Sequence, residues 1–256
     1  MNGKLYATMS GIAQVLIFVI LNSVIYQILA LMFKDTSVPY NLLAILANLI
    51  CVPLLLRWRK KIRRNGIVAP GKRGTALWML LALIIGPLLN NLIYLSGIMD
   101  YSSGYQSAKE GFSSGAAIWL FLNTVLLTPF VEEVLYRGIL YEKIREKYRT
   151  VGGILISALV FGIVHANVPQ FLYATVLGIV LAIVYREGLL VWSYVTHALV
   201  NLIAFARYFE PFASWESERT HVLYEVGPLL AGFVVVLVLL MNRRRKSKRT
   251  FAKVKY

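Results

Sequence analysis

Long apolar stretches recur along this chain, and they constrain its fold more than any other feature. Crossing the roughly 30 Å of hydrocarbon in a bilayer takes about 20 helical residues. On this criterion we identify eight stretches, at residues 9–33, 39–56, 75–96, 116–141, 152–166, 171–185, 189–208 and 227–241. The sequence therefore predicts an all-α, polytopic membrane helix bundle of about eight transmembrane helices, with residues 1–256 forming a single integral membrane domain.

The composition agrees with a membrane protein and argues against a nucleic-acid-binding one. Hydrophobic residues make up 58% of the chain, charged residues 15%, and the mean hydropathy is +0.66, values that are typical of polytopic membrane proteins. The formal net charge is +15, but the Lys and Arg residues cluster in short segments between apolar stretches and after Met241. This clustering is typical of a cytoplasmic membrane face. We expect the lipid bilayer, and no nucleic acid, as a partner.

The charges of the connecting segments also predict an orientation. One set of segments holds nearly all Lys and Arg: 57–74, 142–149, Arg186 and a basic tail at 242–256. The other set holds few of them and is richer in acids: 34–38, 97–114 and 207–226. Because Lys and Arg accumulate on the cytoplasmic side, we expect both termini and the tail to be cytoplasmic. The small size and the lack of organelle signals favour the plasma membrane of a bacterium.

Two adjacent carboxylates and an arginine interrupt the fourth apolar stretch, in the segment TPFVEEVLYRG at 128–138. An unpaired carboxylate is costly in such a setting. Residues four apart share a helix face, so Glu133 can pair with Arg137, whereas Glu132 lies about 100° around the helix. We interpret Glu133 and Arg137 as a supporting ion pair and Glu132 as a general base. A purely structural charge network is the alternative.

Two further polar sites lie in apolar stretches: FGIVH, ending at His165, and HALVN, from His197 to Asn201. At 1.5 Å per residue from the expected cytoplasmic boundary, Glu132, His165 and His197 lie on the order of 12 to 20 Å inside. They could therefore meet in one buried active site, in the cytoplasmic half of the membrane or near its midplane, in a cavity that opens toward the cytoplasm or laterally into the lipid. Together these groups supply a base, a water-orienting group and oxyanion donors. Nearby residues that could assist are Tyr136, Asn167 and Tyr194.

The sequence requires no cofactor, although zinc remains open. Glu132, His165 and His197 match a catalytic zinc ligand set, but HExxH is absent and the three residues come from separate helices. Cys51 is the single cysteine, which excludes an internal disulfide. Since no Ser lies in a GxSxG context, a serine or cysteine nucleophile is not favoured.

The three polar sites together resemble the CPBP intramembrane proteases, also called the Abi family, which include the CAAX prenyl endopeptidases and bacteriocin-processing or immunity proteins. EExxxR is matched from Glu132 to Arg137, FxxxH from Phe161 to His165, and HxxxN by HALVN. The resemblance covers about residues 116–207, which we expect to form the catalytic core helices. It implies that Glu132 activates water that His165 helps to bind. It also implies oxyanion stabilisation by His197 and Asn201, with Glu133, Arg137 and Phe161 as supporting residues.

The function that this resemblance implies is an intramembrane endopeptidase, either metal-dependent or glutamate-driven. Its substrate would be a membrane-associated peptide or protein, such as a peptide precursor, a bacteriocin or a CAAX-like protein. A non-catalytic immunity or sensor-binding protein that retains the protease fold is an alternative. A transporter or proton relay is another, against which the lack of any internal repeat counts.

Overall fold

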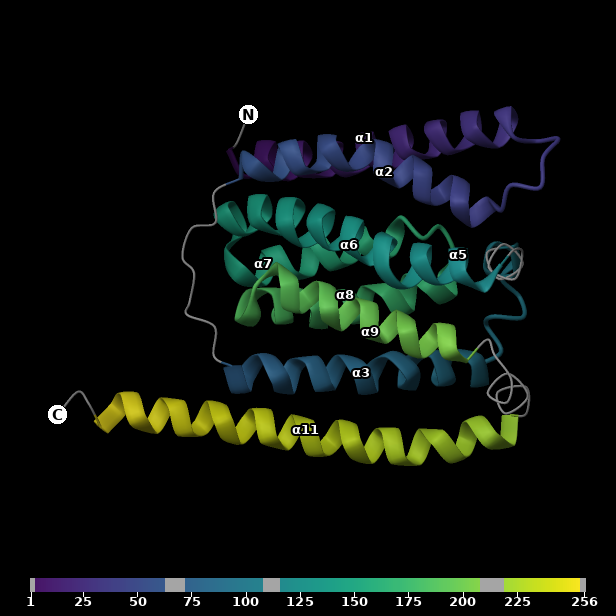
Figure 1. Ribbon diagram of the computed structural model, residues 1–256. Coiled ribbons are helices and arrows are strands. Elements are labelled where there is room, and N and C mark those ends of the chain that lie inside the picture. The colour runs from purple at the N-terminus through teal and green to yellow at the C-terminus, as the bar shows by residue number, and fades with distance from the viewer. Residues whose placement is uncertain (1–2, 63–71, 108–115, 208–218, 254–256) are drawn as a thin grey trace.

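The computed structural model describes residues 3–62, 72–107, 116–207 and 219–253, and every regular element assigned in these ranges is a helix. The helices run side by side in a bundle, with α1 and α2 along one side and α11 along the other (Figure 1). The long helices are α1 (Gly3–Met32), α2 (Tyr40–Lys60), α3 (Lys72–Leu95), α7 (Glu142–Ile163), α8 (Val168–Gly188), α9 (Leu190–Ala206) and α11 (Arg219–Lys253). Between α3 and α7, a continuous helix alternates between α and π geometry: α5 (Ala117–Phe121), η1 (Leu122–Leu127), α6 (Thr128–Glu132) and η2 (Glu133–Tyr141).

The predicted apolar stretches all fall on these helices. Within the described ranges, six helices are long and apolar enough to cross a membrane, and Leu190–Ala206 is a shorter apolar helix. One of the six, Ala117–Ile163, runs for 47 residues and bends at Arg149, whose φ of 62° and ψ of −175° are not helical. Its two arms carry the fourth and fifth predicted stretches, and the shorter helix carries the seventh. The prediction of an all-α polytopic membrane bundle is confirmed.

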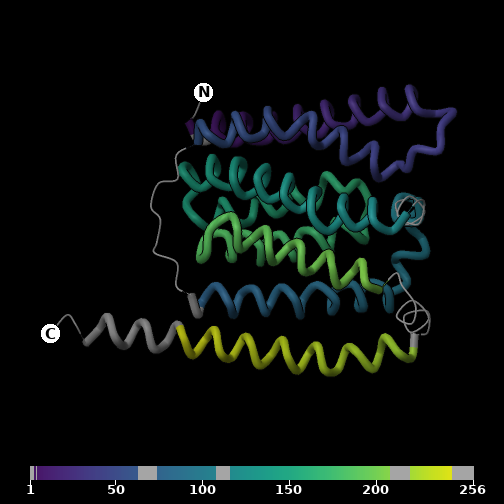
Figure 2. The backbone as a smooth tube through the Cα atoms, in the orientation of Figure 1, coloured from purple at the N-terminus to yellow at the C-terminus, as the bar shows by residue number. Residues whose placement is uncertain are grey.

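The helix ends form two groups (Figure 2). At one end, which we call the basic end, α1 begins, α2 ends, α3 begins, α7 bends at Arg149, α8 meets α9, and α11 ends. At the other end, which we call the distal end, α1 ends, α2 begins, α3 ends, α5 begins, α7 meets α8, α9 ends, and α11 begins. The predicted basic tail from residue 242 continues α11 as a helix up to Lys253. Parts of the predicted connections, 63–71, 108–115 and 208–218, lie outside the described residues, as do 254–256.

The connection from α8 to α9 at the basic end is very short. Leu189 alone separates Gly188 from Leu190, and its φ of 87° and ψ of 166° turn the chain back on itself. This conformation is strained for a residue with a side chain. The two helices are thus joined without spare length, which fixes their relative positions along the bundle.

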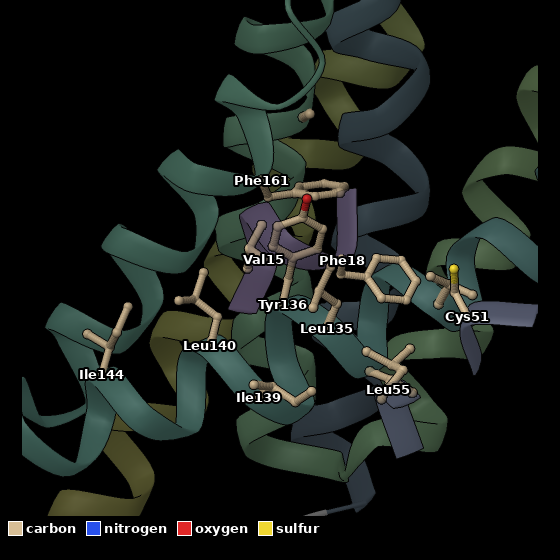
Figure 3. Close-up of a cluster of buried hydrophobic side chains, with 13 residues drawn as sticks. Val15, Phe18, Cys51, Leu55, Leu135, Tyr136, Ile139, Leu140, Ile144 and Phe161 are labelled. Carbon is tan, nitrogen blue, oxygen red and sulfur yellow. The ribbon is translucent and has the colours of Figure 1, made fainter. Parts of the chain in front are cut away.

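The main apolar cluster packs α1 and α2 against η2 (Figure 3). It includes Val15 and Phe18 from α1 and Leu55 from α2, together with Leu135 and Ile139 from η2. All five are at most 4% exposed. The helix that carries the acidic pair is therefore held on one side by close apolar packing.

A glycine brings α7 and α8 into close contact beside the polar sites. A Cβ atom on Gly162 would overlap the hydroxyl of Thr175 and would lie 2.9 Å from the carbonyl oxygen of Phe171. Small residues at helix interfaces allow such approach in membranes, where van der Waals contact contributes much of the helix association. Gly162 therefore sets the spacing between α7 and α8.

We expect Gly162→Ala to lower the free energy of unfolding by about 1–3 kcal/mol, because a methyl group there has no room. Thermal unfolding of the purified protein in detergent measures this effect. Gly227→Ala is the matched control, since no atom lies within 4 Å of a Cβ at Gly227. Equal stability of the two variants would contradict the assigned role of Gly162.

Candidate active site

Pro129 shapes the helix directly before the acidic pair. In η1 the N–H of Thr128 donates to the carbonyl of Asn123, five residues back, and Pro129 has no N–H to offer. The carbonyl of Thr124 thus lacks both of the donors that a helix would normally present to it. It accepts instead from Nδ2 of Asn201 on α9, at 2.8 Å. Such π-helical segments often occur at functional sites, and here one orients a predicted site residue.

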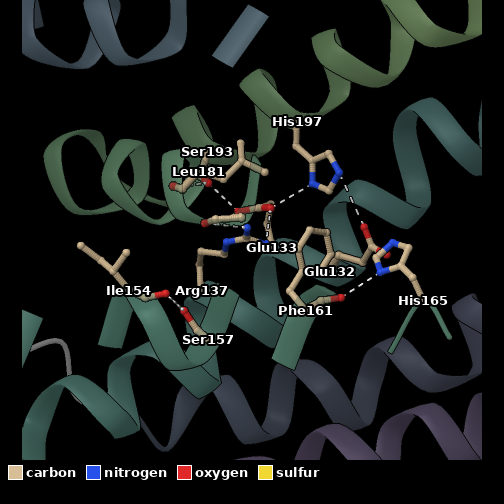
Figure 4. A network of polar contacts seen from close by, with 11 residues as sticks. Glu132, Glu133, Arg137, Ile154, Ser157, Phe161, His165, Leu181, Ser193 and His197 are labelled. Atoms are coloured by element: carbon tan, nitrogen blue, oxygen red, sulfur yellow. Dashed lines mark hydrogen bonds and ion pairs between the residues drawn. The ribbon is translucent and has the colours of Figure 1, made fainter. Parts of the chain in front are cut away.

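Glu133 is the centre of a buried polar network (Figure 4). Its side chain is fully buried, and Oε1 lies 2.8 Å from Nη1 of Arg137. The same oxygen lies 2.9 Å from Nδ1 of His197, and Oε2 accepts a hydrogen bond from Ser193 at 2.5 Å. The predicted ion pair between Glu133 and Arg137 is therefore confirmed, and Glu133 also holds two residues of α9.

Arg137 extends this network to α7 and α8. Its Nη2 donates to the carbonyl of Gly178 at 3.2 Å, and its guanidinium carbon lies 4.7 Å from the centroid of the Phe161 ring. Stacking on an aromatic face stabilises a desolvated cation. Phe161 of the second motif thus supports the arginine of the first.

The two adjacent glutamates have different environments. A carboxylate can only accept when ionised, so the bond to Glu133 assigns a proton to Nδ1 of His197. The other ring nitrogen, Nε2, lies 3.7 Å from Oε2 of Glu132, which is too far for a direct hydrogen bond. The side chain of Glu132 is 22% exposed, against 0% for Glu133. Glu132 is therefore the carboxylate that water can reach.

His165 lies just beyond the end of α7, where its ring is fixed by the backbone. Its Nδ1 lies 2.8 Å from the carbonyl oxygen of Phe161, and because a carbonyl only accepts, this nitrogen carries the proton. Ala166 leaves the helix with φ of 56°, and Asn167 caps α8 by accepting from the N–H of Gln170 at 3.0 Å. The amide of Asn167 also donates to the carbonyl of His165 at 2.9 Å. Asn167 thus positions the turn that carries His165.

One cavity of about 430 Å³ brings the three motifs together, since Glu132, His165, His197 and Asn201 all line it. It also draws on residues that the motifs do not include: Gly86, Pro87, Asn90 and Ile93 of α3, and Met99 and Tyr105. These six precede the range 116–207. The cavity lies toward the distal end, whereas the sequence predicted an opening toward the cytoplasm or laterally into the lipid.

None of the three assisting residues named from the sequence, Tyr136, Asn167 and Tyr194, lines the cavity. Tyr136 packs against Phe161, with ring centroids 4.9 Å apart, and Tyr194 packs against Phe130 at 5.9 Å. Ser193 was not predicted, although it lies four residues before His197, a spacing that puts both side chains on one helix face.

The residues named as zinc ligands do not form a metal site in this structure. Their donor atoms are of types that zinc binds, yet in the described parts of the chain no group of three or more His, Cys, Asp or Glu side chains is arranged to hold a metal ion.

Comparisons with known proteins agree with the motifs. Residues 114–203 match the family model "Type II CAAX prenyl endopeptidase Rce1-like", a range that contains all three motifs. The chain is 25% identical over 199 residues to the Bacillus subtilis (strain 168) protein named "Putative membrane peptidase YdiL", and the alignment covers 74% of this chain and 80% of that protein. No solved structure gives a significant match.

Proposed function

We propose that this chain is a membrane endopeptidase of the CPBP family in which Glu132 activates a water molecule; the family match over residues 114–203 and the similarity to a membrane peptidase support this. One observation carries the proposal. Glu132 is open to the cavity and faces His197 Nε2 at 3.7 Å, while the neighbouring Glu133 is buried and holds the opposite nitrogen of the same ring. Two adjacent carboxylates thus take separate roles.

The attacking water binds between Glu132 and His165. With its proton on Nδ1, a neutral His165 has a lone pair on Nε2 that accepts a hydrogen bond from water. Glu132 accepts the second hydrogen and takes that proton as the water oxygen attacks the peptide carbonyl carbon. Both acceptors line the same cavity.

His197 and Asn201 stabilise the oxyanion that forms. In this role His197 donates from Nε2, the nitrogen that faces Glu132, because Nδ1 is already bonded to Glu133. Asn201 lies one turn further along α9, and its amide has a second N–H besides the one bonded to Thr124. Donors that are oriented before the reaction stabilise developing charge effectively.

The tetrahedral intermediate then collapses, and the C–N bond breaks. Glu132 returns its proton to the leaving nitrogen, so the products are an amine and a carboxylic acid, and the glutamate is regenerated. The substrate is a membrane-associated peptide or protein, such as a peptide precursor, a bacteriocin or a CAAX-like protein. The enzyme acts in the plasma membrane of a bacterium.

This mechanism takes no step through a metal ion, and it predicts that chelators leave activity unchanged. Dialysis of the purified protein against EDTA, and then against 1,10-phenanthroline, is expected to change turnover by no more than about twofold. Such a change is smaller than the effect of losing one intramolecular hydrogen bond. Turnover that is lost with chelator and restored by zinc alone would contradict the metal-free mechanism.

Pro129 is expected to affect turnover through Asn201. In Pro129→Ala, the new N–H can donate to the Thr124 carbonyl and displace the Asn201 amide. Losing one hydrogen bond costs about 0.5–1.5 kcal/mol, so turnover is expected to fall roughly two- to tenfold. The matched control is Pro53→Ala in α2, which is also a proline within a helix and does not line the cavity. Equal turnover of both variants would show that Pro129 does not influence the active site.

Complementation of a deletion strain tests the proposed function. The strain receives the wild-type protein, Glu132→Gln, His197→Ala, or the control Glu146→Gln, whose carboxylate is 59% exposed at the basic end. Mass spectrometry then compares the processed peptides at matched protein levels. We expect one processing event to disappear with the first two variants only. Full complementation by both would indicate the non-catalytic immunity or sensor-binding role instead.

A further inference from the structure

The cavity is confined to the distal half of the bundle. On α9, its lining begins at His197 and continues through Asn201 to Arg207, at the distal end of the helix. On α8, which runs in the opposite direction, the lining starts at Pro169 and stops at Leu177. The same holds for α3, where only residues from Gly86 onward contribute, and for the arm from Ala117 to Tyr141, where none after Glu132 does.

In the basic half of the bundle, buried side chains fill the space between the site and the basic end. Glu133 and Arg137 are 0% and 1% exposed. Beyond them, an apolar cluster that includes Tyr141, Ile154 and Tyr185 fills the space between η2, α7 and α8. Tyr185 also donates to the buried carboxylate of Glu142 at 2.7 Å. These buried side chains lie between the site and the basic end.

The charges assign these two ends to opposite sides of the membrane. Of the 27 Lys and Arg residues, 22 lie in the sequence at or between the helix ends that meet at the basic end. Only Lys34, Lys109, Arg207 and Arg219 belong to the sequence at the distal end, and seven of the 12 acidic residues also belong there. Because Lys and Arg accumulate in cytoplasmic segments, the basic end is cytoplasmic and the distal end is extracytoplasmic.

The rim of the cavity is polar, and hydrogen bonds join its side chains at the distal end. Arg207, which lines the cavity, donates to Asn91 of α3 at 3.0 Å and to Glu225 of α11 at 2.6 Å. Asn91 donates to the same carboxylate at 2.9 Å. Below this rim the walls include Ile93, Ile203 and Phe205. These walls offer apolar contacts to the side chains of a peptide, and the rim offers polar groups.

We propose that the site takes its substrate from the extracytoplasmic side. The cleaved bond belongs to an exported peptide or to the external segment of a membrane-anchored protein, which narrows the proposed substrates and excludes a CAAX-like protein that ends in the cytoplasm. This inference rests on the proposed function, because only a protease has a peptide substrate to admit. The direction of access depends on the fold and the charges alone.

Cysteine labelling tests the direction of access without requiring catalysis. The single native cysteine is buried at 1% exposure, so Cys51→Ala gives a background without accessible thiols. Into it are introduced Ala204→Cys or Asn90→Cys, two positions that line the cavity, and Glu146→Cys as a control at the basic end. Intact cells are treated with a charged, membrane-impermeant maleimide before and after permeabilisation.

We expect the two cavity positions to react in intact cells, at least tenfold more than the control, and the control to react only after permeabilisation. The reverse pattern, or no reaction of either cavity position on either side, would overturn the inference. Labelling from outside together with full complementation by Glu132→Gln would refute the proposed function and leave the direction of access standing. Conversely, labelling from the cytoplasm only, with processing that depends on Glu132, would refute the direction alone.

Discussion

Replacing Glu132 with glutamine is expected to lower the turnover of the peptide substrate by about 10²- to 10⁴-fold, the range that a general base contributes. Glutamine has nearly the same shape and still accepts a hydrogen bond from water, but it cannot take the proton. The fold should not suffer, because the side chain of Glu132 is 22% exposed and the Arg137 ion pair belongs to Glu133. Turnover by purified Glu132→Gln, together with its thermal unfolding midpoint, checks both parts.

Glu142→Gln provides a control that should affect stability and not turnover. Glu142 is also a nearly buried carboxylate, at 4% exposure, and it is paired with Arg145 at 2.8 Å near the basic end. We expect this variant to lose stability and to keep its turnover per folded molecule. A Glu132→Gln protein that retains more than about a tenth of wild-type turnover would be inconsistent with a general base worth at least 10²-fold.

The second large effect is expected on stability. Arg137→Met leaves the charge of Glu133 in a fully buried site without its cation, and breaking a buried ion pair by removing one partner costs about 3–5 kcal/mol. The guanidinium contacts with Gly178 and Phe161 are lost as well. Unfolding of the purified variant in mixed micelles by increasing SDS measures the loss.

The double variant Glu133→Gln with Arg137→Met separates charge from packing. If the uncompensated carboxylate causes the loss, removing it should recover part of the stability, because residues in contact are not additive. A double variant that is as unstable as the sum of the two single variants would show that the ion pair has no coupling energy. The neutral double variant is not expected to be active, since Glu133 also orients His197.

The sequence was sufficient for those parts of the site that depend on local spacing. Glu133 and Arg137 pair because residues four apart share a helix face, and apolar length alone located the helices. The gathering of Glu132, His165, His197 and Asn201 around one cavity followed from motifs on three helical segments. Their chemical roles remain predictions, which the Glu132 and His197 variants test.

Other parts of the site depend on tertiary contacts that spacing does not encode. The contribution of α3 to the cavity required knowing which helices pack against α8 and α9. The hydrogen bond from Asn201 to the Thr124 carbonyl depends on the π-helical hydrogen-bonding register of η1. Pro129 favours that register, but a proline alone does not predict it. The depth estimate from the sequence placed the site in the cytoplasmic half or near the midplane, whereas the cavity along α8 and α9 lies in the distal half.

The unequal lengths of the connections have a consequence for how such an enzyme can diversify. At the basic end, Leu189 alone joins α8 to α9, so inserting one residue in α9 before His197 would rotate its side chain by about 100° relative to that turn. At the distal end, 96–116 and 207–218 separate the long helices, and connections of this kind tolerate insertion and exchange. Changes in these distal connections can therefore alter substrate specificity while the helices that carry the catalytic residues stay the same.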